Sequence, residues 1–220
     1  HFGTNSNLEE LKKLPKIKKY LAEYYNCTEE KICVGDYIPK EETRCPYKVI
    51  LGNSGNADFA NSKITDLGKL KIIGENAFFT DSKITNLGKL QIIGGDANFA
   101  SSKITDLGKL QSIGGSASFR YSEITNLGEL QSIGGNADFA NSKITTLGEL
   151  QNIGGDAYFN TSNIIYLGKL QSIGRTAYFP FSKVTDLGNI EYIGGEIMTD
   201  ENNSYLKEEY ERRVNGKSLK

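Results

Sequence analysis

The residue types that usually carry out catalysis are scarce in this chain. His1 is the only histidine, and it stands at the first position of the sequence. A Ser–His–acid or Cys–His triad therefore lacks a credible base, and a zinc site lacks ligands. The segment 216–218 reads Gly-Lys-Ser, but Glu211 stands where a phosphate-binding loop requires its first glycine. We expect no bound metal ion and no cofactor.

Carboxylates are the remaining candidates for catalysis. Paired carboxylates bind Ca²⁺ or hydrolyse glycosides, and acidic residues recur sparsely along the chain at Asp58, Asp96, Asp138 and Asp156. At the usual strand spacing, Asp58 and Asp138 lie about 19 Å apart, too far to act on one bond. We therefore expect that the chain is not an enzyme. A carbohydrate-active enzyme with a closer carboxylate pair is the alternative from that class.

Aromatic side chains beside an arginine are better candidates for function, and they indicate binding. Exposed tyrosines and arginines are typical of the residues that dominate binding energies. They gather in the second half of the chain, where the candidate partner-binding residues are Arg120, Tyr121, Tyr158, Tyr178 and Phe181. A second interpretation stays open for Tyr158 and Tyr178, in which the two rings cover the end of the fold against a C-terminal helix.

A repeated unit must position these side chains. Residues 57–196 are seven consecutive copies of 20 residues, with the consensus A-x-F-x-x-S-x-I-T-x-L-G-x-L-Q-x-I-G-G-x. A fixed period of this length predicts a solenoid in which each coil contacts only its neighbours. The alternation Ala-x-Phe predicts one parallel strand per coil, and Leu-x-x-Leu-x-x-Ile predicts a turn with a short helical or 3₁₀ segment.

The copies show which positions are structural. Phe recurs from Phe59 to Phe179 and is expected to form one buried column of stacked rings. Ser recurs from Ser62 to Ser182 and is expected to pair with backbone groups in the turn, rather than to act as a nucleophile. The residue between Ala and Phe varies, because it points away from the core.

The pattern A-x-F-x-x-S-x-I-x-x-L in each copy resembles the leucine-rich-repeat signature L-x-L-x-x-N-x-L-x-x-L, and L-x-x-L-x-x-I-G-G is similar to bacterial and receptor-L-like repeats. The resemblance covers residues 57–196, with Ala and Phe at the two strand leucines and Ser at the asparagine. It implies an α/β solenoid, a stack of seven coils with a parallel β-sheet on the concave face. Ser in place of Asn shortens the side chain that carries the family's hydrogen-bonding ladder.

The two ends of the chain depart from the repeat and are predicted to cap it. Residues 1–48 are expected to form a helical N-terminal cap, with a capping-box pattern at Ser6 and Glu9 and with Tyr24 on the apolar face of the helix. Residues 49–199 are the solenoid. Residues 200–220 are expected to form a C-terminal capping helix, through Leu206, and a tail.

Charge and cysteine content limit the function and the compartment. The 220 residues include 26 Lys and Arg against 27 Asp and Glu, and this balance holds within the repeats. It excludes the basic surface of a general nucleic-acid-binding protein, and no apolar run reaches the ~20 residues of a membrane span. Cys27, Cys33 and Cys45 are expected as free thiols of a cytoplasmic protein; a disulfide in a secreted or cell-surface protein is the alternative.

Taken together, these patterns predict a monomeric leucine-rich-repeat-like module that recognises another protein through its concave sheet and the C-terminal aromatic patch. Two alternatives stay open among binding functions. One is an inhibitor that occludes a partner's working surface, such as a phage-encoded anti-CRISPR blocker of a bacterial defence nuclease. The other is a secreted or cell-surface adhesin that binds host protein or glycan.

Overall fold

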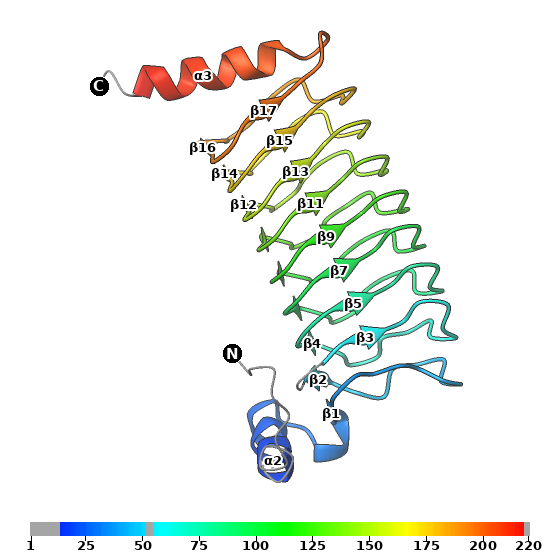
Figure 1. Cartoon of the computed structure of the whole chain (residues 1–220). Coiled ribbons are helices and arrows are strands. Elements are labelled where there is room, and N and C mark those ends of the chain that lie inside the picture. The colour runs from blue at the N-terminus through cyan, green and yellow to red at the C-terminus, as the bar shows by residue number, and fades with distance from the viewer. Residues whose placement is uncertain (1–13, 52–54, 218–220) are drawn as a thin grey trace.

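The chain folds into a stack of parallel coils with a helix at each end. The structure, a computed structural model, describes residues 14–51 and 55–217, so the capping pattern at Ser6 and Glu9 lies outside the described residues. Figure 1 shows the coils stacked in a nearly straight row, with α2 (Leu14–Tyr24) at one end and α3 (Tyr205–Lys217) at the other. The prediction of a solenoid with a 20-residue period and helical caps is confirmed.

Every coil contributes a short strand to each of two parallel sheets. Sheet A has nine strands, in the order β1 (Ile32–Val34), β2 (Val49–Leu51), β4 (Ile72–Ile73), β6 (Ile92–Ile93), β8 (Ser112–Ile113), β10 (Ser132–Ile133), β12 (Asn152–Ile153), β14 (Ser172–Ile173) and β16 (Tyr192–Ile193). Sheet B has eight, in the order β3 (Ala57–Asp58), β5 (Ala77–Phe78), β7 (Ala97–Asn98), β9 (Ala117–Ser118), β11 (Ala137–Asp138), β13 (Ala157–Tyr158), β15 (Ala177–Tyr178) and β17 (Ile197–Met198). The Ala-x-Phe strand is therefore sheet B, and sheet A is a second sheet that the sequence analysis did not predict.

A third line of pairing closes each coil into three sides. Single parallel bridges join successive coils through Asn86, Asp106, Asn126, Thr146, Tyr166 and Asp186. All three lines keep the same offset of 20 residues along the regular coils, as in Ala137↔Ala157 and Ile133↔Ile153. Equivalent residues of neighbouring coils therefore lie directly above one another, in columns.

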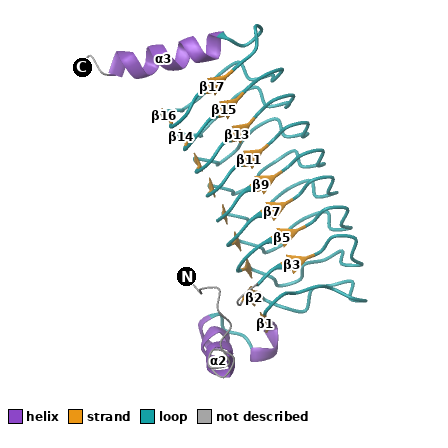
Figure 2. Ribbon diagram, viewed as in Figure 1, coloured by secondary structure: helices purple, strands orange, loops and turns teal. Residues whose placement is uncertain are grey.

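The helical segment predicted inside each coil is absent from the described coils. Figure 2 shows helix only at the two ends of the stack, with strands and loops between them. At Leu67 the chain makes a single turn, in which the Leu70 amide donates to the Leu67 carbonyl at 3.1 Å. The Asp66 carboxylate accepts the Gly68 amide at 2.6 Å, and Gly68 has a φ of +61°. This left-handed glycine turns the backbone out of a helical path after one turn.

The core is built from columns of identical apolar side chains. The phenylalanines form the predicted continuous column, each 0% exposed, with ring centroids 5.1–5.4 Å apart along it: Phe59, Phe79, Phe99, Phe119, Phe139, Phe159 and Phe179. Neighbouring rings are close to parallel, at 4° between Phe119 and Phe139. Ala, Ile and Leu of the consensus are buried around this column.

The corner between sheets A and B leaves no room for a side chain. A Cβ added to Gly134 would lie 2.1 Å from the carbonyl oxygen of Gly114 in the coil below. Real Cβ atoms do not approach backbone so closely, so the residue at this corner must be glycine if successive coils are to stack at strand spacing.

The N-terminal cap adds an irregular coil beneath the repeats. After α2, the 3₁₀ helix η1 (Glu29–Lys31) leads into β1, which pairs in register with β2. Ala22 of α2 packs with Ile32 and Val49, whereas Tyr24 is 70% exposed. The expectation that Tyr24 lies on the packed face is therefore wrong; Ala22 and Tyr25 face the stack instead.

The C-terminal cap closes the other end through apolar and polar contacts. Leu206 of α3 is fully buried in the main core, and the Tyr210 hydroxyl accepts the backbone amide of Ile193 at 2.8 Å. Asn203, in the turn before the helix, donates to the Phe179 carbonyl at 2.6 Å. The bond from Ile193 satisfies an amide on β16, the last strand of sheet A, which has no further strand to pair with. Within the described ranges, neither α2 nor α3 is long and apolar enough to cross a membrane.

Replacing one ring of the phenylalanine column tests the coil frame. Phe119→Ala removes a fully buried ring stacked on both sides, so we expect the free energy of unfolding to fall by ~3–5 kcal/mol in urea denaturation. Ser118→Ala, at the neighbouring outward position of sheet B, is the control and should cost less than ~0.5 kcal/mol. A loss below ~1 kcal/mol for Phe119→Ala would show that the ring is not in the core.

Removal of the C-terminal cap should expose the last coil. Deletion of residues 204–220 uncovers the apolar surface beneath Leu206 and frees the edges of β16 and β17. Because an open parallel edge pairs with other chains, we expect the truncated protein to self-associate in sedimentation velocity. A monomer of unchanged stability would show that α3 is an appendage and not a cap.

Candidate functional site

Two tyrosines stack on the outer face of sheet B. Tyr158 and Tyr178 are register partners in β13 and β15, and their ring centroids lie 4.7 Å apart with an angle of 11° between the planes. Both side chains are half-buried, because each ring covers one face of the other. Burial, followed by the negative charge of Asp156, raises the pKa of the Tyr158 hydroxyl.

Arg120 connects this pair to Tyr121. The Arg120 guanidinium lies 5.6 Å from the centre of the Tyr121 ring, and its Nη1 donates to the Asp138 carboxylate at 3.2 Å. Asp138 is in turn the register partner of Tyr158. These five residues form a continuous row along sheet B and the corner that follows it, which we call the sheet B patch. The sequence analysis named four of them and missed the contribution of Asp138.

Tyr121 and Phe181 lie at the corner after sheet B and not on the sheet itself. Both have a left-handed backbone, with φ of 55° and 57°, and both are largely exposed, at 60% and 71%. The same corner position holds Asn61, Asp81, Ser101, Asn141 and Thr161 in the other coils. Asn and Asp tolerate this conformation better than bulky residues do. The aromatic residues thus occupy strained positions without gaining burial.

The α3 cap binds elsewhere on the last coil. The helix contacts the backbone through Tyr205, which donates to the Val184 carbonyl at 3.1 Å, and through Arg213, which donates to the Gly188 carbonyl at 2.8 Å. Val184 and Gly188 belong to the other sides of the coil. Among the described residues, no hydrogen bond joins α3 to Tyr158 or Tyr178. The described hydrogen bonds of α3 therefore do not involve the two tyrosine rings.

A side-chain ladder runs beside the tyrosines, two positions before them in each coil. The side-chain oxygen at this position accepts the backbone amide of the same position in the next coil, as Asn136 does from Asp156 at 2.8 Å and Asp156 from Thr176 at 3.0 Å. The same bond recurs from Asp36, Asn56, Asn76, Asp96 and Ser116. Residues of this ladder hold the sheet B face in register.

The consensus serines do not form the ladder that was expected of them. Ser82, Ser102, Ser122, Ser142 and Ser162 are buried, and their hydroxyls contact no hydrogen-bond partner in the described part of the chain. Ser62 is different, since its oxygen accepts the Ile64 amide at 3.3 Å. The expectation that the serine column pairs with the turn backbone is therefore wrong for the interior coils. The column fills space in the core, and the ladder lies on the outer face.

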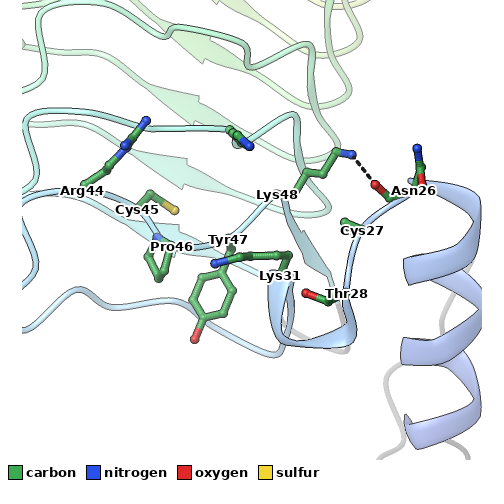
Figure 3. A pocket seen from close by; sticks show the side chains of 10 residues that line it. Asn26, Cys27, Thr28, Lys31, Arg44, Cys45, Pro46, Tyr47 and Lys48 are labelled. Carbon is green, nitrogen blue, oxygen red and sulfur yellow. Dashed lines mark hydrogen bonds between the residues drawn. The ribbon is translucent and has the colours of Figure 1, made fainter.

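A cavity of about 420 Å³ lies between α2 and the first coil (Figure 3). Two of the cations that line it already have structural roles. Lys48 donates to the carbonyls of Tyr25 and Asn26 at the end of α2, and Arg44 pairs with Asp66 at 3.0 Å. The three cysteines nearby are free, and burial raises the pKa of the Cys45 thiol to about 11, so this thiol is not a nucleophile at neutral pH.

Nothing in the described residues assembles a metal site: no three His, Cys, Asp or Glu side chains come together.

Because the backbone of Tyr121 is strained, replacing this residue should stabilise the fold. Tyr121→Asn places a residue that tolerates φ of 55° and already fills this corner at Asn141, so we expect thermal or urea unfolding to show a gain of about 0.5–1 kcal/mol. The reverse change, Asn141→Tyr, should cost a similar amount. If Tyr121→Asn destabilises the protein, the ring contributes to the fold through its contact with Arg120.

Comparison with protein-family models, with curated proteins and with solved structures gives no match for this chain. Membership of the leucine-rich-repeat family therefore stays a prediction, and function is argued from the surface.

Proposed function

We propose that this chain is a protein-binding solenoid, similar in role to leucine-rich-repeat modules, and that its partner contacts the sheet B patch. The observation that carries the proposal is the stacked pair Tyr158–Tyr178, which stands on the outer face of sheet B. Tyrosine is enriched where binding energy concentrates, because it offers a large contact area at a low entropic cost.

The surroundings of the pair suit a contact surface. The two rings are fixed by stacking, and Asp138 is fixed by Arg120 and by accepting the Ala140 amide at 3.0 Å. Little side-chain freedom is lost when such a surface is covered, which favours affinity. The outward positions of the earlier coils hold Asp58, Asn98, Ser118 and Asp138, with Phe78 as the one large apolar side chain among them.

The compartment and the biological role belong to the same proposal. Free Cys27, Cys33 and Cys45 favour a reducing cytoplasm over a secreted location. A module of this kind could act as an inhibitor by occluding a partner's surface; an adhesin role is favoured only if the thiols pair under oxidising conditions.

The binding role is tested after capture of a partner from native lysate and its identification by mass spectrometry. Tyr158→Ser with Tyr178→Ser copies the residue that Ser118 supplies at the same position, so the fold should be retained. We expect this double change to weaken the partner by at least ~2 kcal/mol in titration calorimetry.

The matched control is Asp58→Ser with Asn98→Ser, at equivalent positions in the first coils. It should change the affinity by less than ~1 kcal/mol, because these residues lie far along the stack from the patch. Loss of folding with retained binding in the tyrosine variant would place the partner on another face.

A further inference from the structure

The near-neutral charge of the chain conceals a separation of charge between its faces. The two outward columns of sheet B, which are the ladder position and the position of Tyr158, contain Asp58, Asp96, Asp138, Asp156 and Glu196 and no Lys or Arg within the repeats. Five of the ten lysines in the repeats follow the corner, at Lys63, Lys83, Lys103, Lys143 and Lys183, and the third side of the coil mixes lysines with Glu129, Glu149 and aspartates. The outward columns of sheet B are therefore acidic, although no segment of the sequence is.

The carboxylates next to the tyrosines are not neutralised by the fold. One oxygen of Asp156 accepts the Thr176 amide, and the carboxylate forms no ion pair with any described residue. Glu196 is exposed, two residues before Met198, which is the register partner of Tyr178. Asp156 and Glu196 therefore flank the tyrosine pair along the ladder column, with Thr176 between them.

Aromatic rings beside unpaired carboxylates favour the binding of organic cations. A guanidinium or ammonium group gains from the ring face and from the carboxylate together, and the gain is greatest where water is partly excluded. The molecule already shows this arrangement once, where Arg120 lies over Tyr121 and pairs with Asp138. In the part of the chain that the structure describes, Asp156 and Glu196 beside the Tyr158–Tyr178 pair form no ion pair with Lys or Arg.

We infer that the sheet B face recognises a basic protein segment, whose arginine or lysine side chains contact Tyr158 and Tyr178 and pair with Asp156 and Glu196. This inference rests on the proposed function and names the chemistry of the partner. Complementary charge would speed the encounter and select against acidic partners, including nucleic acids.

The positive charge of Arg175 should repel a basic segment, so replacing Arg175 tests the inference within the same protein. It stands exposed at the glycine corner just before Thr176, where Gly135 and Gly155 stand in earlier coils. No ion pair joins it to Asp156 or Glu196 among the described residues. Arg175→Gly should therefore leave the fold intact and strengthen the binding of a cationic segment.

The test uses a fluorescent peptide of alternating Arg and Gly, with a Glu–Gly peptide as its acidic counterpart, in anisotropy titrations. The test variant is Asp156→Asn with Glu196→Gln; it keeps the ladder bond, because Asn136 makes the same bond. The matched control is Asp106→Asn with Glu191→Gln, which removes the same charge elsewhere. Asn86 and Gln171 already fill those two positions in other coils.

We expect the full-length protein to bind the Arg–Gly peptide and not the Glu–Gly peptide. The test variant and the tyrosine double variant should each lose at least about five-fold in affinity, the control should change less than about two-fold, and Arg175→Gly should gain about two-fold. Binding should weaken as salt rises from about 50 to 300 mM.

Three results would overturn the inference: no Arg–Gly binding at about 1 mM peptide, equal binding of the Glu–Gly peptide, or an equal loss in the control. Binding of the captured partner to the same variants distinguishes failure of the basic-segment inference from failure of the proposed function. If the partner needs the tyrosines but tolerates the loss of Asp156 and Glu196, the binding role stands and the basic-segment inference fails. If the partner ignores the tyrosines, the proposed site itself is wrong.

Discussion

The close approach of successive backbones at the glycine corner is the constraint on which the stack depends. A Cβ at Gly134 or Gly154 would meet the carbonyl oxygen of the coil below at 2.1 Å, so the corner admits one backbone path. That path fixes the offset at 20 residues on all three sides of the coil. A single inserted residue would turn inward side chains outward, because side chains alternate along a strand. Columns of equivalent residues, inside and outside, follow from this one restriction.

The columns separate structural from functional residues more sharply than in a globular core. Inside, Phe119 meets the same neighbour on both sides, so any change is felt by two coils. Outside, a column tolerates Asp, Ser, Asn or Tyr because each side chain contacts only the rungs next to it. Charge can then accumulate on one face without altering the composition of any segment. This is why the balance of acidic and basic residues in the sequence conceals an acidic face on sheet B.

The sequence allowed the period, the phenylalanine column and both helical caps to be predicted, since each depends on local patterns repeated many times. It did not reveal sheet A, because a two-residue strand such as Ser132–Ile133 next to Gly134-Gly135 resembles a turn. The ladder was assigned to the serines by analogy with leucine-rich repeats, whereas the structure places it at Asn136 and Asp156. The link between Arg120 and Asp138 joins residues 18 apart and depends on the coil's cross-section, which no periodic pattern specifies.

The sheet B patch and the residues around it depart from the consensus of the repeat. Tyr121 and Phe181 replace residues that suit a left-handed corner, and they accept backbone strain while remaining exposed. Arg175 replaces a corner glycine, and Tyr158 and Tyr178 replace small polar residues. A solenoid confines the cost of each departure to one or two coils, so such changes can gather near one end without unfolding the stack. Because none of these side chains improves the core, their cost is best explained by contacts that the isolated chain does not make.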